Sequence, residues 1–409
     1  MMLRKIIKVI INSKILFKLP ENIDLVIFDN VSLKDLEKYL LKDLNYFVLK
    51  TRHYEIDEIY LSLKLFKRIT KNLKYFFSKN FSIQDIYFLS LIEILEPKVV
   101  FTIIDNSYQF SSIAQNIDDK KIKFIALQGG MRHMWQLQNY MFEKKLTKYD
   151  LNKKFYIPFY LCYSEFEKKQ CKALGLNIGK FKFVGSLRLA NFLLEIKNSK
   201  IKKNYDICLI SDHGAWLDYF DKKQLDIIDQ VQNGYIKLIK WTIGYSKKNN
   251  LKFVFAFKRK ENTPSFLEEK NFYKKELNDE EYDFLISNAS FNTEKNYFNS
   301  YFLSFQSELT IAKTSTLLRE VFVCNNKILA CNLTGSNLFD YPVDGICALN
   351  NSSLEKFENR ISEILSLSNE SYFSEIYKPK NYLVHQNNPE VIIESIKKEL
   401  IVDFKQDLV

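Results

Sequence analysis

Three hydroxyl residues, Thr314, Ser315 and Thr316, follow a short apolar run and precede a stretch with helical spacing. Hydroxyls and open backbone N–H groups at the start of a helix bind phosphate, because the N–H groups point outward and the helix dipole favours negative charge. Glu320 comes four residues after Thr316, one helical turn on, so both side chains are expected to project the same way. A carboxylate there can accept hydrogen bonds from both hydroxyls of a ribose. The alternative is a Thr/Ser helix cap followed by a surface glutamate.

A second polar turn follows the strand expected at residues 206–210. Ligands of doubly wound sheets bind beyond the carboxyl ends of the strands, so residues in such a turn are placed for binding. Ser211, His213 and Gly214 offer a hydroxyl, an imidazole and backbone N–H groups to an anionic or polar ligand. The alternative is a plain turn in which Asp212 caps the following helix.

Three cations, Lys258, Arg259 and Lys260, follow the strand expected at residues 252–257. At the carboxyl end of a strand they suit a diphosphate or a phosphodiester. Because lysine is abundant in this chain, a solvated loop is the alternative. The chain has only eight arginines, so Arg259 favours a site that needs a planar guanidinium.

Two turns in the first half of the chain carry groups suited to proton transfer. Asp105 follows the strand expected at residues 98–104, and it can deprotonate a hydroxyl or act as a nucleophile. His133 lies beyond the strand expected at residues 122–127 and is the competing base. The alternatives are that Asp105 caps the next helix and that His133 is a satisfied structural imidazole.

The polar turn that leads to this histidine is unusual for the chain. Gln128 opens it, and Gly129 is the first of a glycine pair in a sequence with only ten glycines. Such a pair indicates close approach of the backbone to a ligand or a positive φ. Arg132 can hold a carboxylate or phosphate through two parallel hydrogen bonds. Arg52 and Glu55, which follow an earlier expected strand, are candidates for the same side of the site.

Short apolar, β-branched or aromatic runs alternate with longer stretches of helical spacing along the whole chain. Continuous apolar runs indicate strands buried on both faces, which is typical of a parallel sheet covered by helices. Repeated strand–helix units predict a doubly wound α/β fold. The expected strands are residues 24–28, 46–50, 98–104, 122–127, 159–163, 181–184, 206–210, 252–257, 283–286, 309–312, 327–331 and 346–349.

The strand–helix pattern restarts once, and a length of 409 residues suits two domains. A polar stretch at residues 197–205 separates the last helix of the first series from a fresh strand. We therefore expect a first Rossmann-like domain at residues 1–195 and a second at 205–380. A C-terminal helix at 388–409, with Asn388 as N-cap and proline in its first turn, is expected to pack back on the first domain.

The chain is basic, with 60 Lys and Arg against 49 Asp and Glu and a net charge of +11. Its lysines are spread along the sequence with no arm or stripe, so no nucleic-acid partner is expected. Weak peripheral attraction to the anionic inner face of the cytoplasmic membrane is the remaining consequence. No apolar run approaches the ~20 residues of a membrane span, and no signal-peptide pattern opens the chain. Six cysteines without a CxxC pair favour buried thiols in the cytoplasm.

The order of strand, Ser315-Thr316-Leu317, two residues, Glu320 and another strand resembles the C-terminal domain of GT-B glycosyltransferases. Over nearly the whole chain, VVFTIIDNSYQF at 99–110, KFIALQGGMR at 123–132 and the segment 163–188 resemble bacterial surface-carbohydrate (O-antigen or capsule) biosynthesis proteins. This resemblance implies two Rossmann-like, doubly wound parallel-sheet domains that face a central cleft. The chain lacks a Gly-rich loop at its start and the His-Pro and Asp-Asp-Gly motifs, so donor identity does not carry over.

The resemblance implies transfer of a sugar from a nucleotide-sugar donor, linked to CMP, CDP or UDP, to a lipid-linked or oligosaccharide acceptor of a surface polysaccharide. The nucleotide sugar is a substrate, so no cofactor is expected. No Asp-X-Asp triplet or His/Asp/Glu cluster has metal-ligand spacing, and a metal-independent reaction in which helix dipole and cations stabilise the leaving nucleotide agrees with this. A nucleotide-sugar 2-epimerase on the same scaffold and a non-catalytic polysaccharide-assembly protein are the alternatives.

In this interpretation the second domain holds the donor and the first domain holds the acceptor, with Asp105 or His133 as base or nucleophile. The expected donor-side residues are Ser211, His213, Gly214, Lys258, Arg259, Thr314, Ser315, Thr316 and Glu320. The expected acceptor-side residues are Gln128, Gly129, Arg132, Arg52 and Glu55.

Overall fold

The chain divides into two compact units. The computed structural model describes residues 13–52, 55–79, 81–118, 121–132, 156–214, 225–385 and 388–401. Unit 1 contains Met1–Gly129, Asn152–Asn191 and Asn387–Val409, and unit 2 contains Gly130–Leu151 and Phe192–Gln386.

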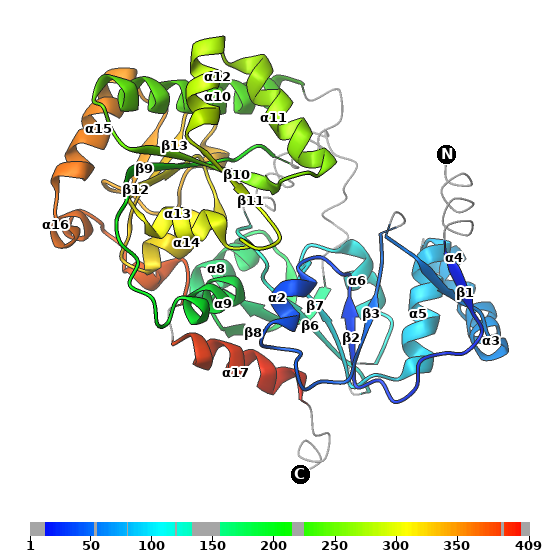
Figure 1. The fold of residues 1–409 in the computed structure, drawn as a ribbon. Helices are drawn as coiled ribbons and strands as arrows, with labels where there is room; N and C mark the ends of the chain where they lie inside the picture. Colours follow the sequence, from blue (N-terminus) through cyan, green and yellow to red (C-terminus); the bar gives the residue numbers. More distant parts are fainter. Residues whose placement is uncertain are drawn as a thin grey trace. The chain divides into compact units, whose positions relative to one another are not determined.

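Unit 1 is built on six parallel strands in the order β3-β2-β5-β6-β7-β8 (Figure 1). Every side chain of β2 and β5 is buried, and β2 is a continuous apolar run, Leu-Val-Ile-Phe. A strand buried on both faces needs helices on both faces, and this is why the runs are not alternating. The strands are β2 (Leu25–Phe28), β3 (Tyr46–Leu49), β5 (Val99–Thr102), β6 (Lys123–Leu127), β7 (Tyr156–Cys162) and β8 (Asn177–Phe183).

The helices of unit 1 begin at side-chain caps that the sequence provides. Ser82 opens α5 through a reciprocal capping box with Asp85, and Ser107 and Ser164 cap α6 and α8. A separate two-stranded parallel sheet pairs β1 (Lys14–Leu16) with β4 (Glu58–Tyr60). The helices are α2 (Leu33–Glu37), α3 (Leu63–Asn72), α4 (Lys74–Lys79), α5 (Ile83–Leu95), α6 (Tyr108–Ala114), α8 (Glu165–Ala173) and α17 (Pro389–Leu400), and α9 (Leu187–Glu195) begins in unit 1 and ends in unit 2.

The C-terminal helix α17 belongs to unit 1. Lys182 on β8 donates to Glu399 Oε1 at 2.8 Å, and Lys397 of α17 donates to Asp43 Oδ2 at 2.9 Å. These contacts join the last helix to the opposite end of the sequence within one unit.

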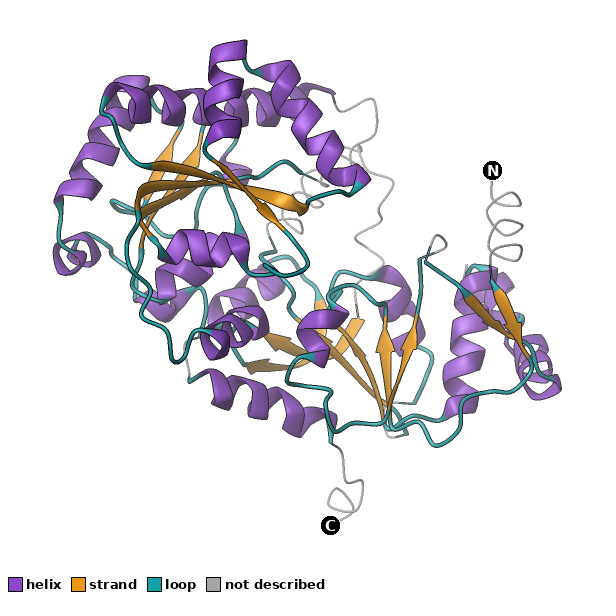
Figure 2. Ribbon diagram, in the orientation of Figure 1, coloured by secondary structure: helices purple, strands orange, loops and turns teal. Residues whose placement is uncertain are grey.

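Unit 2 also has six parallel strands, in the order β11-β10-β9-β12-β13-β14. Counted along the chain this is 3-2-1-4-5-6, the order of a dinucleotide-binding doubly wound sheet. Helices cover both faces: α10, α11 and α12 lie on one side of the sheet, and α13 and α14 on the other (Figure 2). The strands are β9 (Tyr205–Ile210), β10 (Phe253–Lys260), β11 (Ala289–Asn292), β12 (Ser307–Ala312), β13 (Lys327–Asn332) and β14 (Ala348–Asn350).

The described residues of unit 2 form nine further helical elements. They are α10 (Leu225–Lys248), α11 (Pro264–Glu276), α12 (Asp279–Ser287), α13 (Asn299–Phe305), α14 (Thr316–Val323), α15 (Leu354–Ser366) and α16 (Asn369–Ser374), with the 3-10 turns η3 (Asn337–Phe339) and η4 (Lys380–Tyr382).

Two of the expected elements differ from the structure. Residues 283–286 are not a strand but part of α12, because Asn278 and Glu281 form a capping box that starts a helix there. The strand follows directly, as β11. Lys258–Lys260 are not a turn after β10; they are its last residues.

Candidate functional site

The reversal point of unit 2's sheet lies between β9 and β12, where the chain leaves in opposite directions. Ile311 of β12 pairs with Leu209 of β9, so the two strands end at the same level. The residues that follow them, Ser211 and Lys313, therefore emerge side by side at the carboxyl edge. Ligands of doubly wound sheets bind at this edge.

A direct link joins the two expected donor segments at this edge. Thr314 donates to Asp212 Oδ2 from its backbone N–H at 3.1 Å and from its hydroxyl at 3.5 Å. Asp212 therefore fixes the loop that leads into α14. Sequence reasoning proposed Ser211 and Thr314 for one ligand, and the structure brings their segments together.

The three hydroxyl residues at the start of α14 have different roles. Ser315 is the N-cap, and its hydroxyl accepts from the N–H of Leu317 at 3.3 Å. Thr316 Oγ1 accepts from the N–H of Met131 at 2.9 Å. The hydroxyls are thus placed as the sequence predicts, at the opening of a helix on the carboxyl edge.

Glu320 lies in the interior of unit 2. Its side chain is buried, and its carboxylate accepts from the hydroxyl of Tyr301 of α13 at 2.7 Å. The alternative of a surface glutamate is therefore wrong. Contact with a ribose stays a prediction.

A buried carboxylate that sequence reasoning missed organises the end of β10. Glu269 of α11 is fully buried, and it accepts from the N–H of Lys258 at 3.2 Å and of Arg259 at 2.9 Å. The hydroxyl of Ser211 also donates to Glu269. One side chain therefore holds the ends of both β9 and β10. Burial raises the pKa of Glu269, against the opposing effect of these hydrogen bonds.

Two buried tyrosines extend this network. The hydroxyl of Tyr273 lies 2.6 Å from Ser211 Oγ and 2.8 Å from the hydroxyl of Tyr235, which accepts from the N–H of Asp212 at 2.8 Å. Ser211 is thus connected to the backbone of the next residue through two side chains from α10 and α11. Its hydroxyl is engaged inside the unit, so it supports the turn.

Cationic groups gather around this turn. Burial, with Arg259 and Lys258 nearby, lowers the pKa of His213 to about 4, so its imidazole is neutral at neutral pH. His213 Nδ1 and Arg259 Nε are buried and have no hydrogen-bond partner among the described residues. Lys313 is 2% exposed; burial lowers its pKa, while Asp212 opposes the shift. A buried cation and two unpartnered nitrogens favour a ligand with negative charge.

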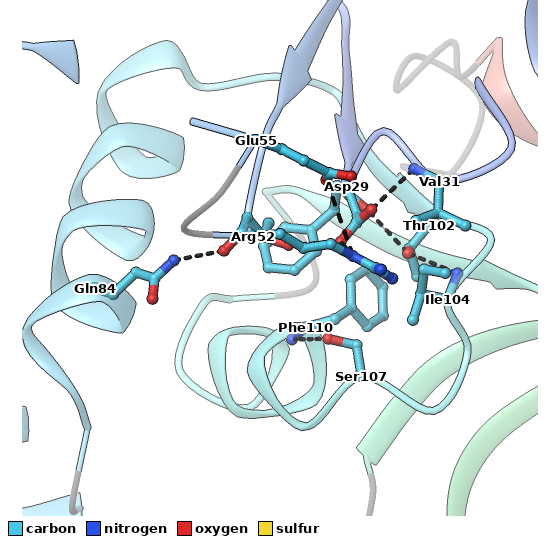
Figure 3. A network of polar contacts seen from close by, with 11 residues as sticks. Asp29, Val31, Arg52, Glu55, Gln84, Thr102, Ile104, Ser107 and Phe110 are labelled. Atoms are coloured by element: carbon cyan, nitrogen blue, oxygen red, sulfur yellow. Dashed lines mark hydrogen bonds and ion pairs between the residues drawn. The ribbon is translucent and has the colours of Figure 1, made fainter. Parts of the chain in front are cut away.

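Unit 1 has its own reversal point, between β2 and β5. Thr102, the last residue of β5, donates its hydroxyl to Phe28 O of β2 at 2.9 Å. The next residue on the β2 side, Asp29, has a φ of 83°, which is uncommon for a residue other than glycine. Its Oδ1 accepts from the N–H of Val31 at 2.9 Å, and this local bond is one reason why an aspartate tolerates the conformation (Figure 3). Strained residues of this kind cluster at functional sites.

The other carboxylate oxygen of Asp29 holds the loop after β3. Asp29 Oδ2 accepts from Thr51 Oγ1 at 2.7 Å and from Arg52 Nε at 3.2 Å (Figure 3). Glu55 Oε2 lies 4.0 Å from the same Nε. The pKa of Glu55 is raised, mainly by burial and also by the nearby charge of Asp29, while Arg52 opposes the shift. The structure therefore brings the predicted pair Arg52 and Glu55 together and adds Asp29, which sequence reasoning missed.

The remaining first-half candidates lie beside other strands. Asp105 is buried and accepts from the hydroxyl of Tyr160 on β7. Gln128 is buried too, and its Oε1 accepts from the N–H of Tyr163 at 2.7 Å. Both side chains are therefore fixed within unit 1.

The glycine turn shows close backbone packing. A Cβ built on Gly129 would lie 2.8 Å from Ile103 O, which explains the glycine by space rather than by a positive φ. Arg132 Nη1 donates to Met131 O at 3.2 Å. His133, the proposed competing base, lies outside the described residues.

Two further properties belong to the described part of the chain alone. None of its helices combines the length and apolar character needed to cross a bilayer. Within the same ranges, no three His, Cys, Asp or Glu side chains gather as a metal site would require.

No protein-family model matches the chain, and none of the curated proteins matches it. Among solved structures, it is similar to UDP-GlcNAc 2-epimerase from Neisseria meningitidis bound to UDP-GlcNAc, with 13% identity, a TM-score of 0.50, and coverage of 91% of this chain and 99% of that one. It is also similar to sucrose-phosphate synthase from Thermosynechococcus elongatus, with 12% identity, a TM-score of 0.45, and coverage of 93% of this chain and 97% of that one. Its similarity to the wall teichoic acid polymerase TagF has 10% identity, a TM-score of 0.44, and coverage of 95% of this chain and 90% of that one.

The similarity to the epimerase supports the fold and nothing more. The TM-scores of the other two structures are too low to support a conclusion. The chain has an α/β fold of the GT-B type with two parallel-sheet domains.

Proposed function

We propose that this protein is a metal-independent glycosyltransferase that moves a sugar from a nucleotide-sugar donor to a surface-polysaccharide acceptor. The observation that carries the proposal is the convergence at the carboxyl edge of β9, β10 and β12. There, Arg259 lies near His213, and Lys313 directly precedes the hydroxyl-rich opening of α14, in a sheet with nucleotide-binding strand order. We assign this edge to the donor nucleotide.

The chemistry follows from the charges at this edge. When the bond between sugar and phosphate breaks, negative charge develops on the leaving nucleotide. Helix N–H groups at Thr316 and the cations Lys313 and Arg259 can stabilise that charge without reorganisation. His213 is neutral at neutral pH, so it acts in this proposal as a hydrogen-bonding group rather than as a charge.

The acceptor is assigned to unit 1. Glu55 is half-buried with a raised pKa beside Arg52, which suits a group that removes a proton from an acceptor hydroxyl. Asp105 and His133 stay proposals for the same step. Asp105 would first have to exchange its bond to Tyr160.

Nucleotide binding tests the donor assignment. A thermal-shift panel of CMP, CDP, UDP and GDP is expected to raise the melting temperature with at least one of them, increasingly with concentration. Glu320→Gln keeps the shape of the side chain that meets Tyr301 but removes its charge. Loss of a charged hydrogen bond to ribose costs about 1.5–3 kcal/mol, so the affinity should fall about 10- to 150-fold.

The matched control is Glu355→Gln, an exposed glutamate on α15 of the same unit. Its nucleotide affinity is expected to equal that of the wild type. Unchanged affinity in Glu320→Gln would contradict the ribose assignment, and no binding of any nucleotide would contradict the donor site. Incubation of nucleotide sugars without acceptor distinguishes glycosyl transfer from epimerisation. An epimer formed in that incubation would mean that the protein is an epimerase. Transfer that persists with a chelator present would support the metal-independent mechanism.

A further inference from the structure

One region of unit 1 combines exposed apolar side chains with a basic helix. We call it the basic lobe: residues 13–18 and 57–76, which hold β1, β4, α3 and the start of α4 (Figure 1). Leu63 is 83% exposed, Phe17 77% and Phe66 65%. Large apolar side chains this exposed are ordinary when scattered, but a group of them marks an interaction surface.

The exposed apolar side chains of α3 form a stripe. Leu63, Phe66 and Leu73, the C-cap residue, follow a spacing of three and seven, so they lie along one side of the helix. The opposite side packs on α5: Leu65 is buried, and Asn72 donates to Glu93 Oε2 at 2.6 Å and to Ser90 Oγ. The helix is therefore anchored without its apolar stripe, which leaves that stripe for another partner.

The charged side chains of α3 itself are all basic, although Asp57 and Glu58 of the lobe precede the helix. The sequence from Ile59 to Phe76 contains five Lys or Arg and no Asp or Glu. Arg68 is paired with Glu93 of α5, at 3.8 Å, but Lys64, Lys67 and Lys71 are exposed on α3. The chain as a whole spreads its lysines, and α3 carries three of them beside its apolar stripe.

The small sheet continues the same surface. The N–H of Leu61 donates to Leu16 O at 2.8 Å, which joins the end of β1 to the turn before α3. Exposed Phe17 follows Leu16 directly, and Leu61 is itself 44% exposed. Exposed apolar residues of two elements thus lie near the start of α3.

We propose that the basic lobe binds an anionic lipid bilayer. At the surface of such a bilayer, the apolar stripe of α3 can enter the boundary between headgroups and acyl chains. The neighbouring lysines can then contact the anionic headgroups, so one partner accounts for both the stripe and the charge. Charge complementarity selects this partner over a second copy of the chain, because two faces carrying Lys64, Lys67 and Lys71 would repel each other. The proposal is independent of the reaction proposed for the two sheets.

Vesicle flotation tests the apolar part. Wild-type protein is expected to float with vesicles of phosphatidylglycerol and phosphatidylcholine and to stay behind with phosphatidylcholine alone. Leu63→Ser with Phe66→Ser should weaken binding about ten-fold or more, because about 0.8 kcal/mol is lost per buried CH₂. Leu267→Ser with Val391→Ser, at positions 56% and 52% exposed elsewhere, is the matched control and should bind like wild type.

Charge reversal tests the electrostatic part. Lys64→Glu with Lys67→Glu should weaken binding about 30-fold or more, since each lysine near an anionic surface contributes about five-fold. Lys200→Glu with Lys202→Glu changes the net charge equally at exposed sites of unit 2 and should have little effect. Equal binding to both vesicle types would overturn the proposal, as would equal loss in both charge variants. Self-association that Leu63→Ser with Phe66→Ser abolishes, without vesicle binding, would assign the surface to a second copy instead.

Discussion

Replacement of Glu269 by glutamine is the sharpest test of how unit 2 supports its carboxyl edge. Glu269 Oε1 accepts from Ser211 Oγ and from the N–H of Lys258, and Oε2 accepts from the N–H of Arg259. Glutamine keeps the shape and one acceptor oxygen. Its amide nitrogen, placed at Oε2, would face the N–H of Arg259, donor against donor.

The expected cost follows from this geometry. One buried N–H loses its acceptor, which costs about 1–3 kcal/mol of unfolding free energy. For a unit of this size, each kcal/mol lowers the melting temperature by roughly 2–4 °C. The backbone of Arg259 should also exchange its amide hydrogen faster, because the bond that protects it is gone.

The pH dependence adds a second signature. Burial raises the pKa of Glu269 above its value of 4.5 in an unfolded chain, so the folded state binds this proton more tightly than the unfolded state does. The resulting stabilisation is complete below the unfolded pKa and is lost as the pH rises through the folded pKa. The free energy of unfolding of the wild type should therefore exceed that of Glu269→Gln by more at about pH 5 than at about pH 8.

Hydrogen exchange measured on peptides of β10, together with thermal melts at both pH values, provides the assay. Glu268→Gln is the control, because this neighbouring glutamate on α11 is exposed and should change stability by less than about 0.5 kcal/mol. Equal exchange at Arg259 in the two variants would refute the role assigned to Glu269. A stability difference that grows with rising pH would refute the sign of its pKa shift.

Two further predictions concern glycine and histidine positions. Gly129→Ala should destabilise unit 1 by about 1–3 kcal/mol in chemical denaturation, because the new Cβ would lie 2.8 Å from a backbone oxygen, Ile103 O. Gly244→Ala, in α10 with nothing within 4 Å, should instead stabilise by up to about 1 kcal/mol. Because the pKa of His213 is lowered to about 4, its contribution to stability should be complete above pH 6.5 and lost as the pH falls toward 4. His213→Asn should lack this loss, and parallel melts across that range would show it.

The fold was readable because its decisive signal is local. Runs such as Leu-Val-Ile-Phe in β2 are apolar without alternation, which indicates a strand buried on both faces whatever its neighbours are. The error at residues 283–286 has the same origin. The apolar content of this stretch suits a strand as well as a helix, and only the capping box of Asn278 with Glu281 decides for the helix.

The site was readable only in part, for a corresponding reason. Residues directly after a strand, such as Asp212 and Thr314, are found by position alone. Glu269 and Tyr273 are not, because they come from a helix and reach the edge from the side. Asp29 follows a strand and was available to the same reasoning, but its positive φ is a property of the folded chain.

Each sheet holds an arginine next to its reversal point, on β3's loop in unit 1 and on β10 in unit 2, and the two are held in different ways. In unit 1, Asp29 meets Arg52 through the side-chain Nε, so part of the positive charge is already balanced there. In unit 2, Glu269 holds Arg259 through the backbone N–H, and its own charge is directed at two N–H groups and a hydroxyl. Glu269 therefore binds the backbone of Arg259 and not its guanidinium group. An anionic ligand could therefore use the guanidinium of Arg259, and this is the physical reason why we propose that sheet for the nucleotide phosphates.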